Sequence, residues 1–502
     1  MQNLAAVKAT PRATAIPRRL PVADVPLAAV ALFYVVVQLV LTDVGRASLS
    51  WDESIYFSQV DPRAPAAYFS APRSRGPSLI AAPVALFTSD PMAIRIYLAV
   101  LSGVLLLAVF RIWSPLIGAG ASALAALLFA TLWVTVDYGT QLMPNIWSAF
   151  AAVAAVGLFV RMGRDGPSSG RLAGLAVSLA CAALIRAPDG VWLAVPLLTA
   201  WALVGRWRRI TIGAAIVCGL ASGLAEWVIE AYVRFGGVRA RLTDSNAVEG
   251  GLNPHWNVGN ALRTANGPLL CRPCLFNYPQ PTRFAWLIAV PLLTLIALVW
   301  AVRARRLATT LLPVVCAVCV SASYLFFLTY FAPRFLLPAY ALLSLPIAQA
   351  AMAAIGRVRT EPTGARLLCL VAVGLLFAGH LASQAVMERG HASAAVRLDG
   401  RYRALANALR SHGVRPPCLL SGNTTTIAYD AGCSSSLSPR PATDSSVAAG
   451  PPVIEASHHE SVAVLAPPGH PRPAWVPTSW QRIALAGSPL VHGWSAWLPP
   501  RS

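Results

Sequence analysis

Runs of mostly apolar residues, each about 20 residues long, recur along most of this chain. A helix that crosses a bilayer needs about 20 such residues, so these runs limit what the chain can fold into. Of the 502 residues, 56% are hydrophobic and 12% are charged; a soluble protein carries roughly twice that charged share. The sequence therefore predicts an all-α polytopic membrane protein with about 11 transmembrane helices, near residues 25–42, 92–112, 117–138, 143–162, 172–186, 190–205, 211–232, 285–302, 307–330, 336–355 and 367–386.

The positive charge of the chain lies between the apolar runs. The formal net charge is +20, from 40 Lys and Arg against 20 Asp and Glu. Nucleic acid is the usual partner of so basic a chain, but here the arginines stand in short clusters that separate the runs, as in cytoplasmic loops of membrane proteins. We therefore expect a multi-pass protein of the cell membrane, with a cytoplasmic N-terminus, an extracytoplasmic C-terminus and no nucleic-acid partner. The clusters are Arg206, Arg208 and Arg209; Arg303, Arg305 and Arg306; and Arg357, Arg359 and Arg366.

The runs divide the chain into three parts. We predict a cytoplasmic tail at 1–24, a transmembrane domain at 25–386 with long outer loops at 43–91 and 233–284, and an extracytoplasmic soluble domain at 387–502. The last part contains "RYRALANALRSHGV", which has the pattern of an amphipathic helix, and the short apolar segments "CLLSG", "SVAVLAP" and "RIALAG", which are typical of strands. These predict a small α/β domain.

The cysteines agree with this topology. Five of the nine lie in predicted spans, and none lies in a predicted cytoplasmic loop. The other four, Cys271 and Cys274 in the second outer loop and Cys418 and Cys433 in the tail, lie in predicted outer segments. An even number of cysteines in an oxidising compartment predicts disulfides, here Cys418–Cys433 and Cys271–Cys274. Half of a zinc site is the alternative for Cys271 and Cys274.

Six ionisable residues lie in or beside the predicted spans. Such groups cost about 2.5–3.5 kcal/mol at the centre of a span, so each needs a reason. Each could be an interfacial charge that is paired or extends to water. All six, however, lie toward the outer end of their spans, which favours a polar cavity that opens outward. They are Asp137, Arg186, Asp189, Glu226, Glu230 and Arg334.

Two adjacent carboxylates follow the first span, in "SLSWDESIYF". An acidic pair in a loop is most often solvated. Beside arginines at a membrane surface, a carboxylate also suits a base that activates an acceptor hydroxyl, and the arginines suit a lipid-linked phosphate. Asp52 and Glu53 are therefore candidate catalytic residues that would face the same cavity.

The order of these features resembles a known superfamily. "WDESIYF" after one span is followed by "RGPSLIAAPVALF", "AIRIYLAVLSGVLLLAVFRI", "QLMPNIWSAFAAVAAVGLFVR", "LAGLAVSLACAALIRAPDGVWLAVPLL" and "YFAPRFLLPAY". Over residues 25–386 this is similar to the integral-membrane glycosyltransferases of the GT-C fold, in the branch of protein-O-mannosyltransferases and aminoarabinose transferases.

The resemblance implies a function and roles for residues. It implies a polyprenyl-phosphate-linked sugar as donor, with mannose a candidate, and transfer to a protein or glycan acceptor on the outer face. By position, Asp52 would be the catalytic base, with Glu53 as second choice, and Arg334 would bind the donor phosphate, with Arg186 as second choice. Many relatives carry an acidic residue where "QLMPNIW" has Asn145, which puts a bridging divalent cation in doubt.

Two other classes of membrane protein remain open from sequence. A transporter or flippase of lipid-linked sugars would also have many spans and buried charges, but its charges should reach the middle of the bilayer. A ligase or polymerase of surface polysaccharide would also have long outer loops with arginines. The acidic pair so soon after the first span, and charges confined to one end, favour the glycosyltransferase.

Overall fold

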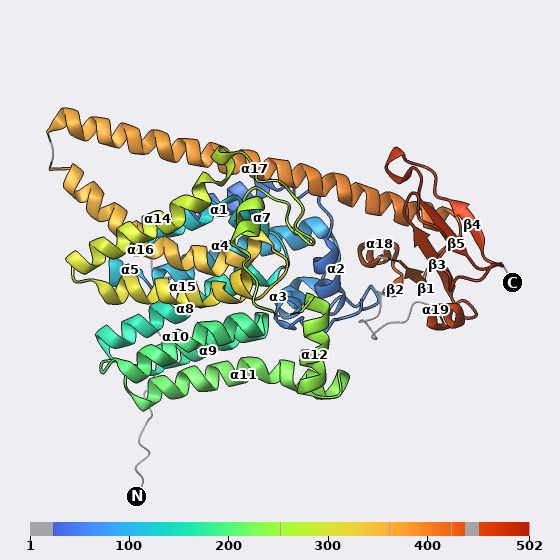
Figure 1. The fold of residues 1–502 in the computed structure, drawn as a ribbon, viewed down its shortest axis with the longest axis horizontal. Helices are drawn as coiled ribbons and strands as arrows, with labels where there is room; N and C mark the ends of the chain where they lie inside the picture. Colours follow the sequence, from blue (N-terminus) through green and yellow to red (C-terminus); the bar gives the residue numbers. More distant parts are fainter. Residues whose placement is uncertain (1–23, 252, 361, 423, 437–450, 501–502) are drawn as a thin grey trace, which may run out of the picture.

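A helical bundle and a small sheet domain make up the fold (Figure 1). This computed structural model describes residues 24–500 except 252, 361, 423 and 437–450, so the predicted cytoplasmic tail, apart from Asp24, lies outside the described residues. The helices up to the sheet domain are α1 (Val25–Leu41), α2 (Trp51–Ser58), α3 (Gly76–Ala85), α4 (Pro91–Arg111), α5 (Ser114–Ile117), α6 (Ala119–Ala130), α7 (Trp133–Gly139), α8 (Pro144–Asp165), α9 (Ser169–Ile185), α10 (Ala187–Leu203), α11 (Ile210–Arg234), α12 (Val238–Glu249), α13 (Val258–Arg263), α14 (Pro281–Arg303), α15 (Leu307–Phe326), η2 (Pro333–Leu336), α16 (Leu337–Val358) and α17 (Thr363–Ser411).

Every predicted span coincides with a helix or with a pair of helices. Among the described residues, seven helices are long and apolar enough to cross a membrane, and the bent pair of α6 and α7 would make an eighth. Helices α1, α9 and α10 are 17 residues long, or about 26 Å at 1.5 Å per residue, slightly less than a bilayer core of about 30 Å. The predicted span at 117–138 is not straight, because its two helices meet at 80°.

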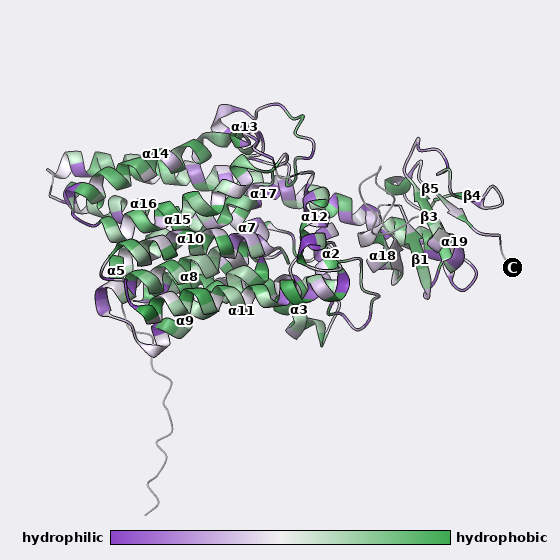
Figure 2. Ribbon diagram, turned by 60° about the horizontal axis from the view of Figure 1, so that its bottom comes forward, coloured by the Kyte–Doolittle hydropathy of each residue, from purple (hydrophilic) through white to green (hydrophobic). Residues whose placement is uncertain are grey.

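Close packing between α9 and α11 depends on small residues. A Cβ on Gly219 would lie 2.5 Å from the Ala176 carbonyl oxygen, and one on Gly223 would lie 2.3 Å from that of Ala180. Small residues four apart let two helix backbones approach, which is a common way to hold helices together in lipid. Figure 2 shows hydrophobic residues over most of the bundle helices.

Helix α17 joins the two parts of the molecule. It has 49 residues, or about 74 Å at 1.5 Å per residue, and runs from the bundle to the sheet domain (Figure 1). The boundary predicted at residue 387 falls inside this helix, and the predicted amphipathic helix is its last part. Leu405 and Leu409 of α17 are buried in the core of the sheet domain, so that domain is built on the helix.

The sheet domain has five strands in the order β2-β1-β3-β5-β4. β1 pairs in parallel with β2 and β3, and β5 pairs antiparallel with β3 and β4. The three predicted strands are β1, β3 and β4, so the predicted small α/β domain is confirmed. The elements are β1 (Cys418–Ser421), α18 (Thr425–Ala431), β2 (Ser434–Ser436), α19 (Pro451–Ala456), β3 (Ser461–Ala466), β4 (Gln481–Ala484), η3 (Pro489–Val491) and β5 (Ser495–Leu498).

The sheet domain touches the bundle through α18, which packs against α2. The Tyr429 hydroxyl donates to Asp61 Oδ2 at 2.8 Å, and its ring meets that of Phe57 edge-on. Ser48, just before α2, donates its backbone N–H to Asp399 Oδ2 at 2.8 Å and its hydroxyl to Asp430 Oδ1 at 3.4 Å. The domain therefore contacts the segment that carries the predicted catalytic pair.

Candidate active site

The predicted catalytic pair lies in the first turn of a short helix. Ser50 has extended backbone angles before α2, and Glu53, three residues on, accepts the Ser50 backbone N–H at 2.9 Å. This is the reciprocal cap that Ser-x-x-Glu sequences make at helix starts. The pair is thus ordered by local sequence, and both carboxylates lie at the helix end that favours negative charge.

Glu53 is fully buried and holds the site together. Its Oε2 lies 3.1 Å from Arg95 Nη2, and its Oε1 accepts the Leu142 backbone N–H at 2.9 Å. Arg95 also donates to the Ser48 carbonyl oxygen. Glu53 therefore joins α2 to α4 and to the segment after α7, and its acceptor sites are used inside the protein.

Asp52 instead faces two arginines. Its Oδ1 lies 2.7 Å from Arg73 Nη2, and its Oδ2 lies 3.4 Å from Arg334 Nη2. Its side chain keeps 28% of its exposure, so solvent or a substrate can reach it. Burial raises the pKa of this carboxyl, but the charges of Arg73 and Arg334 outweigh burial and hold the pKa below its usual range. Asp52 is therefore ionised at neutral pH.

The two predicted phosphate-binding arginines lie near each other. The guanidinium carbons of Arg334 and Arg186 lie 5.4 and 5.2 Å from the centre of the Phe335 ring. Arg186 Nε lies 3.8 Å from Asp189 Oδ1, which also accepts the Tyr324 hydroxyl. The ring and the carboxylate fix the arginines, so their positive charge is set in place before any anion binds.

Polar atoms without a partner lie inside the bundle near these arginines. Among the described residues, the Oδ2 atoms of Asp137 and Asp189, both side-chain polar atoms of Asn145 and the Ser148 hydroxyl are buried and make no hydrogen bond. Buried polar groups in proteins are nearly always satisfied, so such a group needs a ligand or water. These atoms offer hydrogen bonds to a polar ligand.

Glu230 belongs to a second ionic cluster that supports the first. It pairs with Arg75, Arg234 and the fully buried Arg241 at 2.5, 3.1 and 2.8 Å. Arg241 also donates to the Arg73 carbonyl oxygen at 2.9 Å, so the cluster fixes the loop that presents Arg73 to Asp52. Glu226, one turn before Glu230, has a buried Oε2 without a partner among the described residues. A role of Glu226 and Glu230 in lining a cavity stays a prediction.

Two arginines of the site are absent from the sequence-based candidates. Arg95 lies in the apolar run "AIRIYLAV", so the rule that a charge in a span needs a reason would have found it. Arg73 lies in "FSAPRSRGP" of the predicted first outer loop, where only its closeness to Asp52 distinguishes it from Arg75. The distance between the Arg73 and Asp52 side chains cannot be read from the sequence.

The segment predicted to be the second outer loop is hydrogen-bonded to the segment that carries Arg334. Cys271 exchanges two backbone hydrogen bonds with Phe331, at 2.9 and 3.2 Å, and Arg334 Nη1 donates to the Leu269 carbonyl oxygen at 3.4 Å. Cys271 is bonded to Cys274, and in the sheet domain Cys418 is bonded to Cys433. The first disulfide thus lies next to the segment that carries Arg334.

The residues present do not form a divalent-cation site at Asp52. The contacts of this carboxylate are guanidinium groups, and Asn145 is neutral. Within residues 24–500, apart from the gaps noted above, no three His, Cys, Asp or Glu side chains are grouped to hold a metal ion. We therefore assign no step to a cation.

Solved structures share this architecture. No family model and no curated protein matches the sequence. ArnT, an aminoarabinose transferase from Cupriavidus metallidurans solved with undecaprenyl phosphate, matches with a TM-score of 0.61 at 16% identity, over 94% of this chain and 97% of that one. An oligosaccharyltransferase from Archaeoglobus fulgidus, tethered to an acceptor peptide, matches with a TM-score of 0.56 at 12% identity, over 88% of this chain and 69% of that one. The chain has the GT-C fold.

These matches confirm the predicted fold. The match to ArnT covers the bundle and most of the rest of the chain, so it is not limited to a few helices. The matches concern the fold. The ion pairs of Asp52 with Arg73 and Arg334 are observed in the structure of this chain itself.

Proposed function

We propose that this protein is a glycosyltransferase that moves a sugar from a polyprenyl phosphate to an acceptor at the outer face of the membrane. The observation that carries the proposal is the Asp52 carboxylate between Arg73 and Arg334, which come from segments far apart in the chain. The GT-C fold supports it, because the ArnT structure contains undecaprenyl phosphate.

The arginines would bind the donor phosphate. Guanidinium groups match phosphate oxygens with two parallel hydrogen bonds. When the bond between the anomeric carbon and the phosphate oxygen breaks, negative charge grows on the leaving phosphate, and fixed positive charges nearby lower the barrier. Arg334 and Arg73 would supply this charge, with Arg186 behind them.

Asp52 would take the proton of the acceptor. As the acceptor oxygen attacks the anomeric carbon from the face opposite the phosphate, its proton passes to Asp52, and the product has the inverted configuration. When the donor binds, its phosphate would share with Asp52 the positive charge of the arginines that now neutralise Asp52 alone. Because the phosphate offsets part of that positive charge and adds a negative charge nearby, the pKa of Asp52 would rise, and Asp52 would become a stronger base when the donor is present.

The unpaired polar atoms of Asn145, Ser148 and Asp189 support a sugar-binding role for this part of the bundle. Sugar hydroxyls both donate and accept, as these atoms require. We propose mannose as the first sugar to test, with a protein or a glycan as acceptor.

The test is transfer of radiolabel in membranes that contain the protein. Polyprenyl-phosphate mannose is supplied first and polyprenyl-phosphate aminoarabinose second, and label in protein and glycan fractions is counted. Asp52→Asn should lose about 10²–10⁴-fold in rate, as expected when a general base is removed, while the exposed Glu455→Gln should act as wild type. Movement of the donor across the membrane without its consumption would instead indicate a flippase, and full activity of Asp52→Asn would contradict the assigned base.

A further inference from the structure

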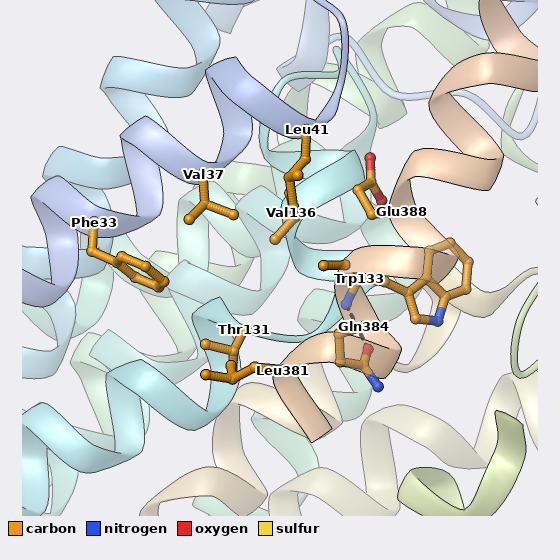
Figure 3. Close-up of a pocket in the computed structure, with 10 residues that line it drawn as sticks. Phe33, Val37, Leu41, Thr131, Trp133, Val136, Leu381, Gln384 and Glu388 are labelled. Atoms are coloured by element: carbon orange, nitrogen blue, oxygen red, sulfur yellow. Dashed lines mark hydrogen bonds between the residues drawn. The ribbon is translucent and has the colours of Figure 1, made fainter. Parts of the chain in front are cut away.

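The wall of the bundle contains a cavity that none of the arginines of the candidate site lines. It has a volume of about 130 Å³ and lies between α1, the bend from α6 to α7, and α17 (Figure 3). Most of its lining is apolar, including Phe33 and Val37 of α1, Val136 of α7 and Leu381 of α17. Phe33 is 42% exposed on a helix that we place in the membrane, so the cavity borders the lipid side of the bundle.

Two polar side chains of α17 line the cavity, and both have unused hydrogen-bonding atoms. Glu388 is 0% exposed, and within the described part of the chain neither of its carboxylate oxygens has a partner. Gln384 accepts the Trp133 backbone N–H at 2.8 Å, the dashed line in Figure 3, but its Nε2 has no partner among the same residues. Figure 3 shows Glu388 beside Leu41 and Val136.

Glu388 has no cationic partner in the part of the chain that the structure describes. Its strongest charged neighbour is Asp137, whose Oδ2 is also unpaired, so the two carboxylates repel each other. The nearby arginines are used elsewhere: Arg95 pairs with Glu53 and Arg334 pairs with Asp52. Among the described residues, the ion pairs include neither Asp137 nor Glu388. Burial and the neighbouring Asp137 both disfavour the ionised form of Glu388, so the carboxyl keeps its proton when the cavity is empty, and a cation that enters the cavity would allow it to ionise.

We propose that this cavity binds the primary ammonium head of a membrane amphiphile, the chemistry of an ethanolamine phospholipid. The ammonium would donate to Glu388, a head-group oxygen would accept from Gln384 Nε2, and the first carbons of the chain would contact Phe33 and Leu381 on the way to the bilayer. A bare metal ion fits less well, because two carboxylates and one amide among apolar walls do not replace its hydration shell. The proposal does not depend on the transferase activity.

The test compares two lipids that differ only in methylation of the amine. Purified protein in neutral maltoside detergent is titrated with lysophosphatidylethanolamine and with lysophosphatidylcholine of the same chain length, and bound lipid is counted by native mass spectrometry. A charge-assisted hydrogen bond should favour the ethanolamine lipid by about tenfold or more. Glu388→Gln should remove that preference, and Glu455→Gln on the surface of the sheet domain should keep it.

Equal binding of the two lipids, or an unchanged preference in Glu388→Gln, would overturn the proposal and leave an apolar groove with a neutral carboxylic acid. If Glu388→Gln does not fold, Val37→Trp replaces it. This change fills the cavity from α1 and leaves Glu388 in place, so it should abolish the ethanolamine preference. Retained preference in a folded Val37→Trp protein would equally reject the site.

Discussion

Asp52 and Glu53 are adjacent in the chain but have different environments. One carboxylate is partly exposed between Arg73 and Arg334, and the other is fully buried against Arg95. The sequence predicts the pair and even favours Asp52, through the family resemblance. It could not separate their roles, because consecutive residues of a helix point about 100° apart and their partners lie far away in sequence.

The pKa of Asp52 leads to a prediction about pH. Since the arginines hold this pKa below its usual range of about 3.9, kcat/KM should show no acid limb from Asp52 above about pH 4. Donor binding should raise the pKa, so kcat should fall at a higher pH than kcat/KM as the medium is acidified. Arg73→Ala should raise the pKa of Asp52, so the acid limb of kcat/KM should move to higher pH. Identical limbs for kcat and kcat/KM would contradict the sharing of arginines between Asp52 and phosphate.

Glu53 should matter for stability more than Asp52 does. Glu53→Gln leaves the Arg95 guanidinium buried without a counter-ion, which costs about 3–5 kcal/mol. Thermal unfolding in detergent should show a clear drop for Glu53→Gln and a much smaller change for Asp52→Asn, whose side chain is partly exposed. A larger drop for Asp52→Asn would reverse the two assignments.

At the scale of elements, the bend between α6 and α7 shows the limit of the sequence pattern. Residues 117–138 form one apolar run without a proline or polar stretch at residues 130–133, so the pattern predicts a straight span. The break is stabilised by distant side chains: Gln384 accepts the Trp133 N–H at the start of α7, and Tyr34 donates to the Thr135 carbonyl oxygen. Free backbone groups at a helix end need such partners in lipid, and local sequence does not reveal them.

The contact between α18 and α2 should depend on pH through Asp430. Burial, and to a lesser degree the charge of Asp399, raises the pKa of this carboxyl to about 6, although Arg403 acts against them. A raised pKa means that the ionised form is disfavoured in the folded state, so stability falls as pH rises from about 4 to 6 and stays lower above that. Asp430→Asn should therefore raise the melting temperature at pH 8, by an amount equivalent to at most about 3 kcal/mol, and raise it by clearly less at pH 4.5. Equal effects at both pH values would contradict this.

At the scale of the whole molecule, the order of the apolar helices and the small α/β domain were predictable, because run length and the spacing of apolar residues indicate them. Which helices meet was not, since Gly219 meets Ala176 and Gly223 meets Ala180 through tertiary packing alone. The orientation in the membrane rests on the arginine clusters. Reporter fusions after Arg306 and after Arg415 should report the cytoplasm and the exterior, respectively, and the same side from both would reject the topology.

The continuity of α17 makes the sheet domain a rigid extension of a membrane span. A helix tilts when the bilayer around it thins or thickens, and a tilt of about 5° over the roughly 40 Å beyond the membrane moves the far end by about 3–4 Å. Since α18 of that domain touches α2, lipid thickness would be transmitted to the position of Asp52. Transfer rates measured in nanodiscs of increasing acyl-chain length should therefore pass through an optimum, and a Gly-Pro insertion after Arg389 should flatten that dependence. If the wild-type transfer rate did not change with acyl-chain length, the tilt of α17 would have no effect on the position of Asp52.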